Sequence, residues 1–190
     1  MFGLFKKLAL ALGLFSAVAT AHAETADAFI KNITDGAVSA LKYNPGLKSG
    51  NPSAVAAYVD GNIMPHVDFR GMVARVVGPA WNQASAAQQN ELIVESRKYL
   101  VRTYASGLKG ASVDSVDVYP ASGSEVRTRI NSSSGKKTMV TYRLTNNGGW
   151  KVNDINVAGV WFVNSYAGQL RPIVNKSGVQ GLIEHLKSKR

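Results

Sequence analysis

Few side chains in this sequence could carry out acid–base or nucleophilic chemistry. The 190 residues include no cysteine and three histidines. His66 and Asp68 could belong to a serine–histidine–aspartate set, but no Gly-x-Ser-x-Gly elbow is present to expose a nucleophile. Asp68 fits better as the cap of a helix that begins near Phe69, with His66 in the preceding loop. We therefore assign no catalytic residue and do not expect an enzyme.

Metal and phosphate binding are not indicated either. Neither His66 nor His185 has a second histidine or a carboxylate cluster at the spacing that a zinc or calcium site requires. Gly148 and Gly149 form a hairpin turn rather than a phosphate loop, because no helix start follows them. We expect no metal and no cofactor.

Two groupings of side chains remain that could bind a partner or a ligand. One is basic and alternates with apolar residues along expected strands: Arg127, Arg129, Arg143 and Lys151. The other is aromatic, and it could line a ligand cavity or, more often, fill an ordinary core: Tyr142, Trp150, Trp161, Phe162 and Tyr166. For the basic residues, a docking surface and a plain solvated face are equally consistent with the pattern.

The elements that must position these residues change along the chain from helix to strand and back to helix. Helical spacing covers residues 26–41, 69–77 and 85–104, and Ser85 with Gln88 forms a capping box at the start of the longest helix. Alternation then predicts strands around 126–130, 140–144 and 150–157, with a bulge or a strand end near Asp154. Two helices close the chain: Pro172 should kink or interrupt the first, and Ser177 could cap the last. This order predicts an α+β domain, an antiparallel meander with helices on one face.

The first 23 residues have the three parts of a secretory signal peptide. Lys6 and Lys7 precede an apolar run over 8–18, and Ala21-His22-Ala23 fits a cleavage signal. That run is far shorter than the roughly 20 residues of a membrane-spanning helix. We expect cleavage to leave residues 24–190 as one domain in the periplasm. The formal charge of +10 then falls by the two lysines to +8, and anionic lipids or acidic proteins are expected partners rather than nucleic acid.

Several segments together resemble the MlaC family, also called the toluene-tolerance family. The segments, in chain order, are IMPHVDF (63–69), VGPAW (77–81), YLVRTYA (99–105), GGWKVND (148–154), NSY (164–166) and GVQGLI (178–183). The resemblance covers nearly all of the chain after residue 23, in order and with compatible spacing. Pro172 and the Trp161–Phe162 pair depart from the family pattern.

Membership of that family would imply a monomeric periplasmic phospholipid carrier. The resemblance implies exchange of lipid between an outer-membrane lipoprotein complex and an inner-membrane ABC transporter with an MCE-domain subunit, which maintains outer-membrane lipid asymmetry. It also implies a curved sheet and helices around an apolar cavity for the acyl chains. Among the core positions, we expect this set to line the cavity: Met72, Val76, Leu92, Tyr99, Tyr142, Trp150, Val152, Val160 and Tyr166.

Two other functions remain open on the sequence alone. One is a nuclear-transport-factor-like α+β enzyme that uses His66 or Asp68 in an apolar pocket. The other is a periplasmic adaptor with a solid core, whose basic face binds an acidic partner. Arg127, Arg129, Arg143 and Lys151 are the expected docking residues for the adaptor and for the carrier.

Overall fold

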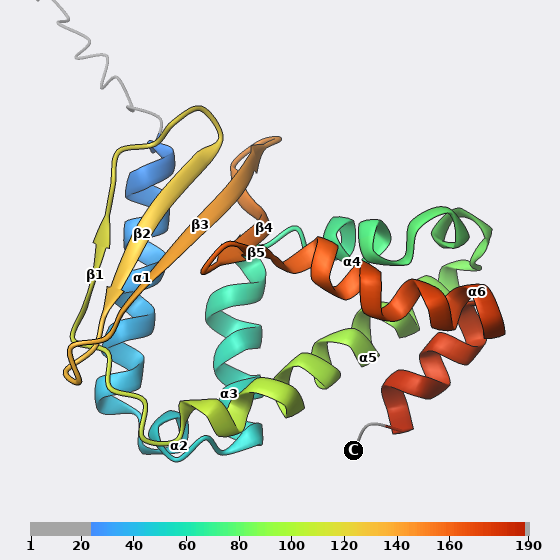
Figure 1. Ribbon diagram of the computed structural model, residues 1–190, viewed down its shortest axis with the longest axis horizontal. Coiled ribbons are helices and arrows are strands. Elements are labelled where there is room, and N and C mark those ends of the chain that lie inside the picture. Colours follow the sequence, from blue (N-terminus) through green and yellow to red (C-terminus); the bar gives the residue numbers. More distant parts are fainter. Residues whose placement is uncertain (1–23, 189–190) are drawn as a thin grey trace, which may run out of the picture.

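The structure, a computed structural model, describes residues 24–188. A five-stranded sheet stands at one end of the molecule and a group of helices at the other (Figure 1). The helices are α1 (Ala26–Tyr43), α2 (Pro45–Lys48), α3 (Pro52–Tyr58), α4 (Phe69–Val77), α5 (Ala86–Tyr104) and α6 (Phe162–Ser188). Short helical turns are η1 (Val59–Ile63), η2 (Met64–His66), η3 (Gly78–Gln83) and η4 (Ala105–Leu108). The strands are β1 (Ser115–Val118), β2 (Glu125–Asn131), β3 (Lys137–Asn146), β4 (Trp150–Val157) and β5 (Val160–Trp161).

The sheet is an antiparallel meander in the order β1-β2-β3-β4-β5. Val126, Val140 and Leu144 are buried, and the residues between them are more exposed, as period-two alternation predicts. The register of β3 and β4 shifts between Arg143 and Leu144, because Arg143 pairs with Asp154 whereas Leu144 pairs with Val152. Since β4 continues past Asp154 to Val157, the bulge is found and not the strand end, which was the other prediction. The α+β prediction is confirmed.

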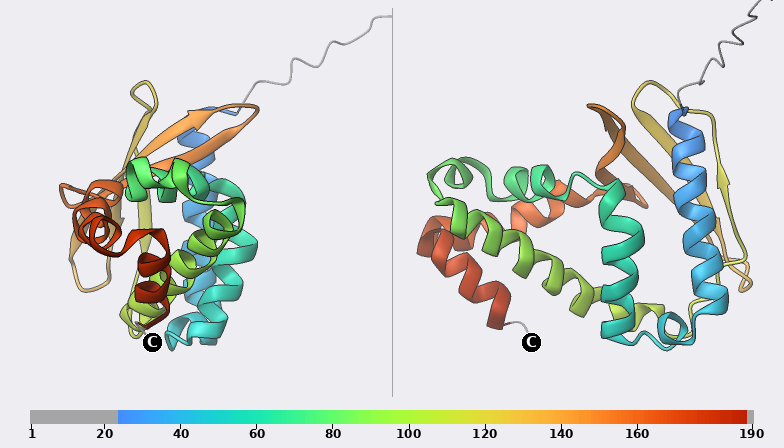
Figure 2. Two further views of the ribbon diagram at one scale, coloured as in Figure 1. Left: turned by 90° about the vertical axis from the view of Figure 1, so that its right-hand side faces the viewer. Right: turned by 180° about the vertical axis from the view of Figure 1, so that it is seen from behind.

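Helix α1 packs against one face of the sheet, as the views from the front and from behind show (Figures 1 and 2). Phe29 and Ile30 of α1 share a buried apolar cluster with Val126, Leu144 and Val152 of the sheet. The Thr25 hydroxyl accepts a hydrogen bond from the Ala28 N–H and so caps this helix. Helix α1 therefore covers part of the sheet face on which Val126, Leu144 and Val152 lie.

Backbone and side-chain hydrogen bonds join the helical group to the sheet. The Asp68 N–H donates to the Val152 carbonyl at 2.9 Å, while the Asp68 side chain caps α4 by accepting from the Gly71 N–H. The Asp154 carboxylate, buried at the bulge, accepts from the Val163 N–H in the first turn of α6. These contacts fix where α4 and α6 leave the sheet.

The longest helical region breaks beside Ser177, where a last helix was predicted to start, and not at Pro172. Helix α6 continues through Pro172, and its only residue with non-helical dihedral angles is Gly178, at φ 67° and ψ −174°. Glycine has no Cβ and adopts positive φ readily, so the chain turns there. The last part of α6 folds back beside α5 (Figure 1). No helix within residues 24–188 is long and apolar enough to cross a membrane.

Candidate functional site: an apolar cavity among three helices

An apolar cavity lies among helices α4, α5 and α6. Its wall is formed by Phe69, Met72, Val73, Val76, Val77, Ser96, Tyr99, Leu100, Phe162, Tyr166, Leu170, Leu182 and Leu186. The cavity volume is about 30 Å³, far below the roughly 300–1,000 Å³ of typical ligand pockets. In this conformation the side chains fill most of the space among the three helices.

Helical periodicity explains why these residues meet. Met72, Val73, Val76 and Val77 project from one face of α4, because residues three and four apart lie on the same side of a helix. Ser96, Tyr99 and Leu100 repeat that spacing on α5. Where α4 ends, Gly78 has φ +76° and the guanidinium of Arg171 lies over it, so a Cβ there would come within 3.2 Å of the Arg171 Nε. The Arg171 Nε donates to the Val76 carbonyl, which holds α6 against the end of α4.

The polar groups of the cavity wall are hydroxyls. Ser96, Tyr99 and Tyr166 are the polar members of the lining, and no charged side chain of residues 24–188 belongs to it. The hydroxyl of Tyr166 lies 2.8 Å from that of Tyr104, at the end of α5. Burial raises the pKa of Tyr166 above its usual value, and the hydrogen bond to Tyr104 adds to the shift. Tyr166 is therefore a neutral hydroxyl at physiological pH.

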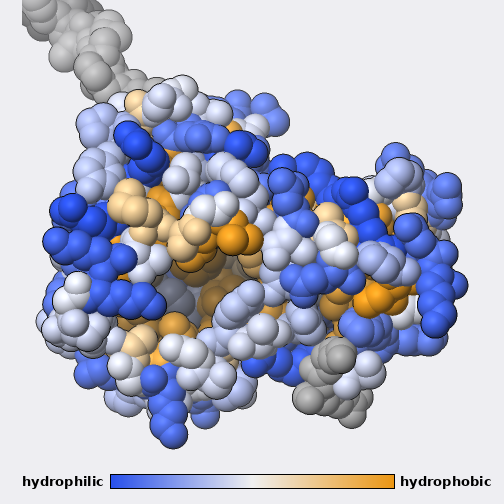
Figure 3. Space-filling view, in the orientation of Figure 1, coloured by the Kyte–Doolittle hydropathy of each residue, from blue (hydrophilic) through white to orange (hydrophobic). Residues whose placement is uncertain are grey.

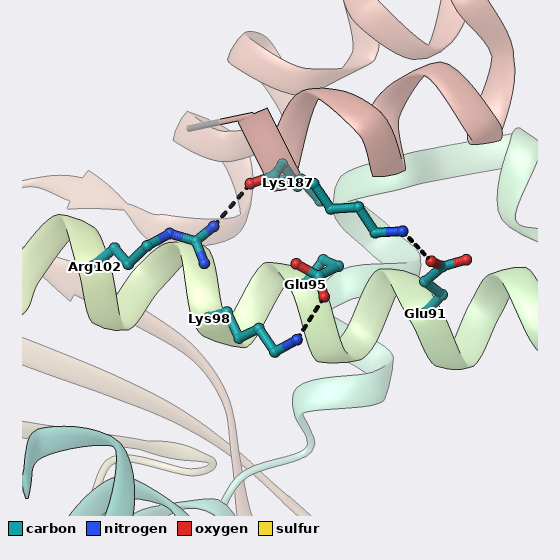
Figure 4. Close-up of polar contacts among 6 residues, drawn as sticks. Glu91, Glu95, Lys98, Arg102 and Lys187 are labelled. Carbon is teal, nitrogen blue, oxygen red and sulfur yellow. Dashed lines mark hydrogen bonds and ion pairs between the residues drawn. The ribbon is translucent and has the colours of Figure 1, made fainter. Parts of the chain in front are cut away.

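The segment of α6 after Gly178 forms the remaining wall. Leu182 and Leu186 point into the cavity, and polar contacts on the outside hold the segment to α5 (Figure 4). Lys187 pairs with Glu91, and the Arg102 guanidinium donates to the Leu186 carbonyl at 2.8 Å. Beside them, the Lys98 ammonium lies 2.8 Å from the carboxylate of Glu95, which is buried. This wall thus combines an apolar inner side with a charged outer side.

Four of the predicted lining residues lie on this cavity: Met72, Val76, Tyr99 and Tyr166. Leu92 is fully buried in the same core cluster but does not reach the free space. Tyr142, Trp150 and Val152 do not line it, because α1 covers their part of the sheet and they pack in the second cluster. Val160 is 59% exposed. The prediction gave Val160 helical spacing, but α6 begins at Phe162 and Val160 lies in the edge strand β5.

Sequence reasoning missed the contribution of the C-terminal segment. Leu182 and Leu186 show the helical spacing of a buried face, which indicated a core position but gave no reason to place it beside a cavity. Phe69, Leu170 and Phe162 were likewise visible only as apolar members of helical stripes. The break at Gly178 returns this segment to α5, and that long-range arrangement places Leu182 and Leu186 in the cavity wall.

The residues considered for catalysis have structural roles. Asp68 is the cap of α4, as predicted. The His66 ring packs edge-on against Phe29, with centroids 5.6 Å apart, and it does not line the cavity. No group of three or more His, Cys, Asp or Glu side chains that could hold a metal occurs in the described part of the chain.

The predicted basic face is partly neutralised. The Arg129 guanidinium pairs with Asp117, and that of Arg143 pairs with Glu125 and lies over the Trp161 ring at 4.1 Å. Hydrogen bonds from Asn131 and Arg129 lower the pKa of Asp117. Arg127 is exposed, and the Lys151 ammonium donates to the Pro65 carbonyl. Of these four residues, Arg127 and Lys151 therefore carry the positive charge that no nearby carboxylate balances.

The surface shows where apolar side chains reach the outside. In the orientation of Figure 1, they gather in a hollow in the middle of the face, between the sheet and the helices, within a largely hydrophilic surround (Figure 3). A second, smaller apolar patch lies over the α5–α6 side.

Comparisons with known proteins agree with this architecture. The model of a protein family described as MlaC protein matches residues 31–188. The intermembrane phospholipid transport system binding protein MlaC of Haemophilus influenzae is 22% identical over 194 residues, which cover 96% of this chain and 91% of that protein. The solved structure of a phospholipid-binding protein from Ralstonia solanacearum, in complex with a phospholipid, matches with a TM-score of 0.78 and 31% identity. That match covers 86% of this chain and 96% of the other.

Proposed function

The chain belongs to the MlaC family, and on that premise we propose that it is a phospholipid carrier that works in the periplasm. Its cargo is a diacyl phospholipid, whose acyl chains occupy the cavity among α4, α5 and α6. The protein carries out no chemical step on the lipid, and it needs no metal or cofactor.

The observation that carries this proposal is the phospholipid held by the similar Ralstonia solanacearum protein. The cavity of this chain suits the same kind of ligand, since its wall is aliphatic and aromatic and contains no charged side chain among residues 24–188. Each methylene group removed from water contributes roughly 0.8 kcal/mol. Two acyl chains therefore supply enough free energy to hold a lipid against return to water, without a strong polar anchor.

Loading requires the cavity to widen. Its volume of about 30 Å³ is far below that of typical ligand pockets, so we expect at least one wall to move when lipid enters. The C-terminal segment of α6 is suited to this, because Gly178 separates it from the rest of the helix and its polar contacts to α5 lie at the surface. Met72 adds adaptability, since an unbranched thioether side chain fits spaces of different shape.

Location and partners follow from the family premise and from the sequence. Residues 1–23, the expected signal peptide, lie outside the described residues, and residues 24–190 form the lipid-binding domain. The carrier exchanges lipid with an outer-membrane lipoprotein complex and with an inner-membrane ABC transporter that has an MCE-domain subunit. Docking uses Arg127, Arg129, Arg143 and Lys151 on the outer face of the sheet, with Arg127 and Lys151 supplying most of the uncompensated charge.

Native mass spectrometry of the protein purified from the periplasm tests this proposal. We expect an adduct with the mass of one or more phospholipids, and fragmentation should release intact diacyl species. Accumulation of free fatty acid or lysolipid during incubation would instead favour an enzyme. A protein without ligand, which also fails to take up phospholipid from vesicles, would overturn the carrier and favour the adaptor.

A further inference from the structure

Resting on the proposed function, we propose that the hydroxyl pair Tyr104–Tyr166 binds an ester carbonyl of the lipid, where the acyl chains join glycerol. The pair would act as the polar end of an otherwise apolar cavity. It would make the protein selective for ester-linked over ether-linked lipids.

The position of the pair fits such a role. Tyr166 lines the cavity and is 7% exposed, whereas Tyr104 is 55% exposed. Their hydroxyls are 2.8 Å apart. The hydrogen bond between them therefore spans the boundary between the buried wall and solvent, which is where the glycerol region of a lipid with buried chains must lie.

The rings of the wall hold the Tyr166 hydroxyl in place. The Phe162 and Tyr166 rings have centroids 4.5 Å apart, and Tyr99 packs edge-on against Tyr166 at 6.3 Å. Because these contacts involve the ring and not the hydroxyl, a phenylalanine at position 166 keeps the packing and removes only the polar group.

Hydrogen-bond accounting leaves a donor for the ligand. Each tyrosine hydroxyl has one proton to donate, and a single bond between the two hydroxyls uses one of the two protons. Whichever residue donates, the other hydroxyl retains its proton. An ester carbonyl is an acceptor only, so it matches the remaining proton.

The chemistry of the wall favours a neutral acceptor over the phosphate. A phosphate anion is bound best by charge-assisted donors such as arginine, and the lining described here contains none. Neutral hydroxyls suit a neutral carbonyl, while the charged headgroup remains in water. An ether-linked lipid has no carbonyl at this position and would leave the hydroxyl pair without that bond.

A competition experiment tests the inference. The delipidated protein is loaded with a fluorescent phospholipid, which is then displaced by dipalmitoyl phosphatidylethanolamine or by its dihexadecyl ether analogue. Headgroup and chain length are the same, so the carbonyls are the relevant difference. One net hydrogen bond corresponds to about a three- to tenfold preference for the ester. In the double variant Tyr104→Phe, Tyr166→Phe, we expect the preference to fall to about onefold, because either single variant leaves one hydroxyl with a proton to donate.

Control variants and outcomes separate the two proposals. Tyr58→Phe removes the hydroxyl of a half-buried tyrosine outside the cavity and should keep the ester preference. Equal binding of ester and ether lipids by the unmodified protein would overturn this inference and leave the carrier standing. No binding of either lipid would overturn both. An ester preference that is the same in the double variant as in the unmodified protein would also overturn this inference.

Discussion

The Lys187 ammonium, in the last turn of α6, forms an ion pair with the Glu91 carboxylate on α5. The pair joins two helices whose inner sides face the apolar cavity, because Leu186 lines the cavity beside Lys187. Both partners are partly exposed, at 44% and 39%, and solvent-exposed ion pairs contribute little to global stability. The contact is therefore placed to slow the opening of one wall without being needed for folding.

We expect Lys187→Gln to speed the exchange of bound lipid while leaving the urea unfolding midpoint nearly unchanged. The measurement is the release rate of a fluorescent phospholipid from the loaded protein into acceptor vesicles. Lys31→Gln is the matched control, because it breaks the exposed Lys31–Asp35 pair on α1, away from the cavity. Equal release rates for both variants would show that the C-terminal segment does not limit exchange.

Enlarging one valine in each apolar cluster should distinguish the cavity wall from the solid core. Val76 lines the cavity and Val152 packs under α1, and both are buried. Replacing either with phenylalanine should lower the free energy of unfolding by about 1–3 kcal/mol through overpacking. Only Val76→Phe should also reduce the lipid content measured by native mass spectrometry. Loss of lipid from a folded Val152→Phe protein would place the α1 cluster within the lipid site.

Two glycines in α6 should respond in opposite directions to alanine. A Cβ at Gly168 or at Gly178 would meet open space, but only Gly178 has a positive φ, of 67°. Gly168→Ala should raise the free energy of unfolding by about 0.4–1 kcal/mol, and Gly178→Ala should lower it by about 1 kcal/mol or more. Urea titrations of the two variants give the comparison. If Gly178→Ala is as stable as the parent protein, the break in α6 is not a fixed feature in solution.

Charge reversal on the outer face of the sheet should slow docking. The double variant Arg127→Glu, Lys151→Glu leaves both ion pairs of that face intact, whereas a change at Arg143 would place two carboxylates together at Glu125. Association with the purified MCE-domain partner should slow at low salt, and the difference should shrink as salt screens the charges. Lipid content should stay the same.

The docking experiment has a control with the same change in charge. Lys48→Glu with Lys109→Glu alters two exposed lysines that are not on the sheet. If this variant slows association as much as the sheet variant does, total charge rather than the sheet face governs docking.

Alkaline pH should destabilise the protein through its buried tyrosines. Burial raises the pKa of Tyr142 and of Tyr166 in the folded state. Above the ordinary tyrosine pKa of about 10, the unfolded chain releases these protons while the folded protein keeps them, so stability falls as pH rises. Urea unfolding between about pH 9 and pH 11 should show a shallower decline for Tyr166→Phe than for the parent protein. Identical declines would mean that Tyr166 ionises normally in the folded state.

Local sequence signals determined the elements of this protein. Ser85 and Gln88 were predicted to form a capping box, and both of its hydrogen bonds are present. Alternation along β2 and β3 identified the buried parity at Val126 and Val140, and the change of parity near Asp154 located the bulge. These features depend on neighbours within a few residues, so the sequence contains the information directly.

Only the tertiary structure decided which apolar side chains surround free space. Val76 and Val152 are similarly buried, and each belongs to the apolar side of its own element in the sequence, but one faces a cavity and the other faces α1. The sequence pattern of a cavity wall is apolar, and so is that of a solid core. The pattern therefore does not distinguish the two. The difference depends on how far two packed elements stand from each other. Here that distance follows from the return of α6 at Gly178 and from the position of α1 on the sheet, which are long-range arrangements.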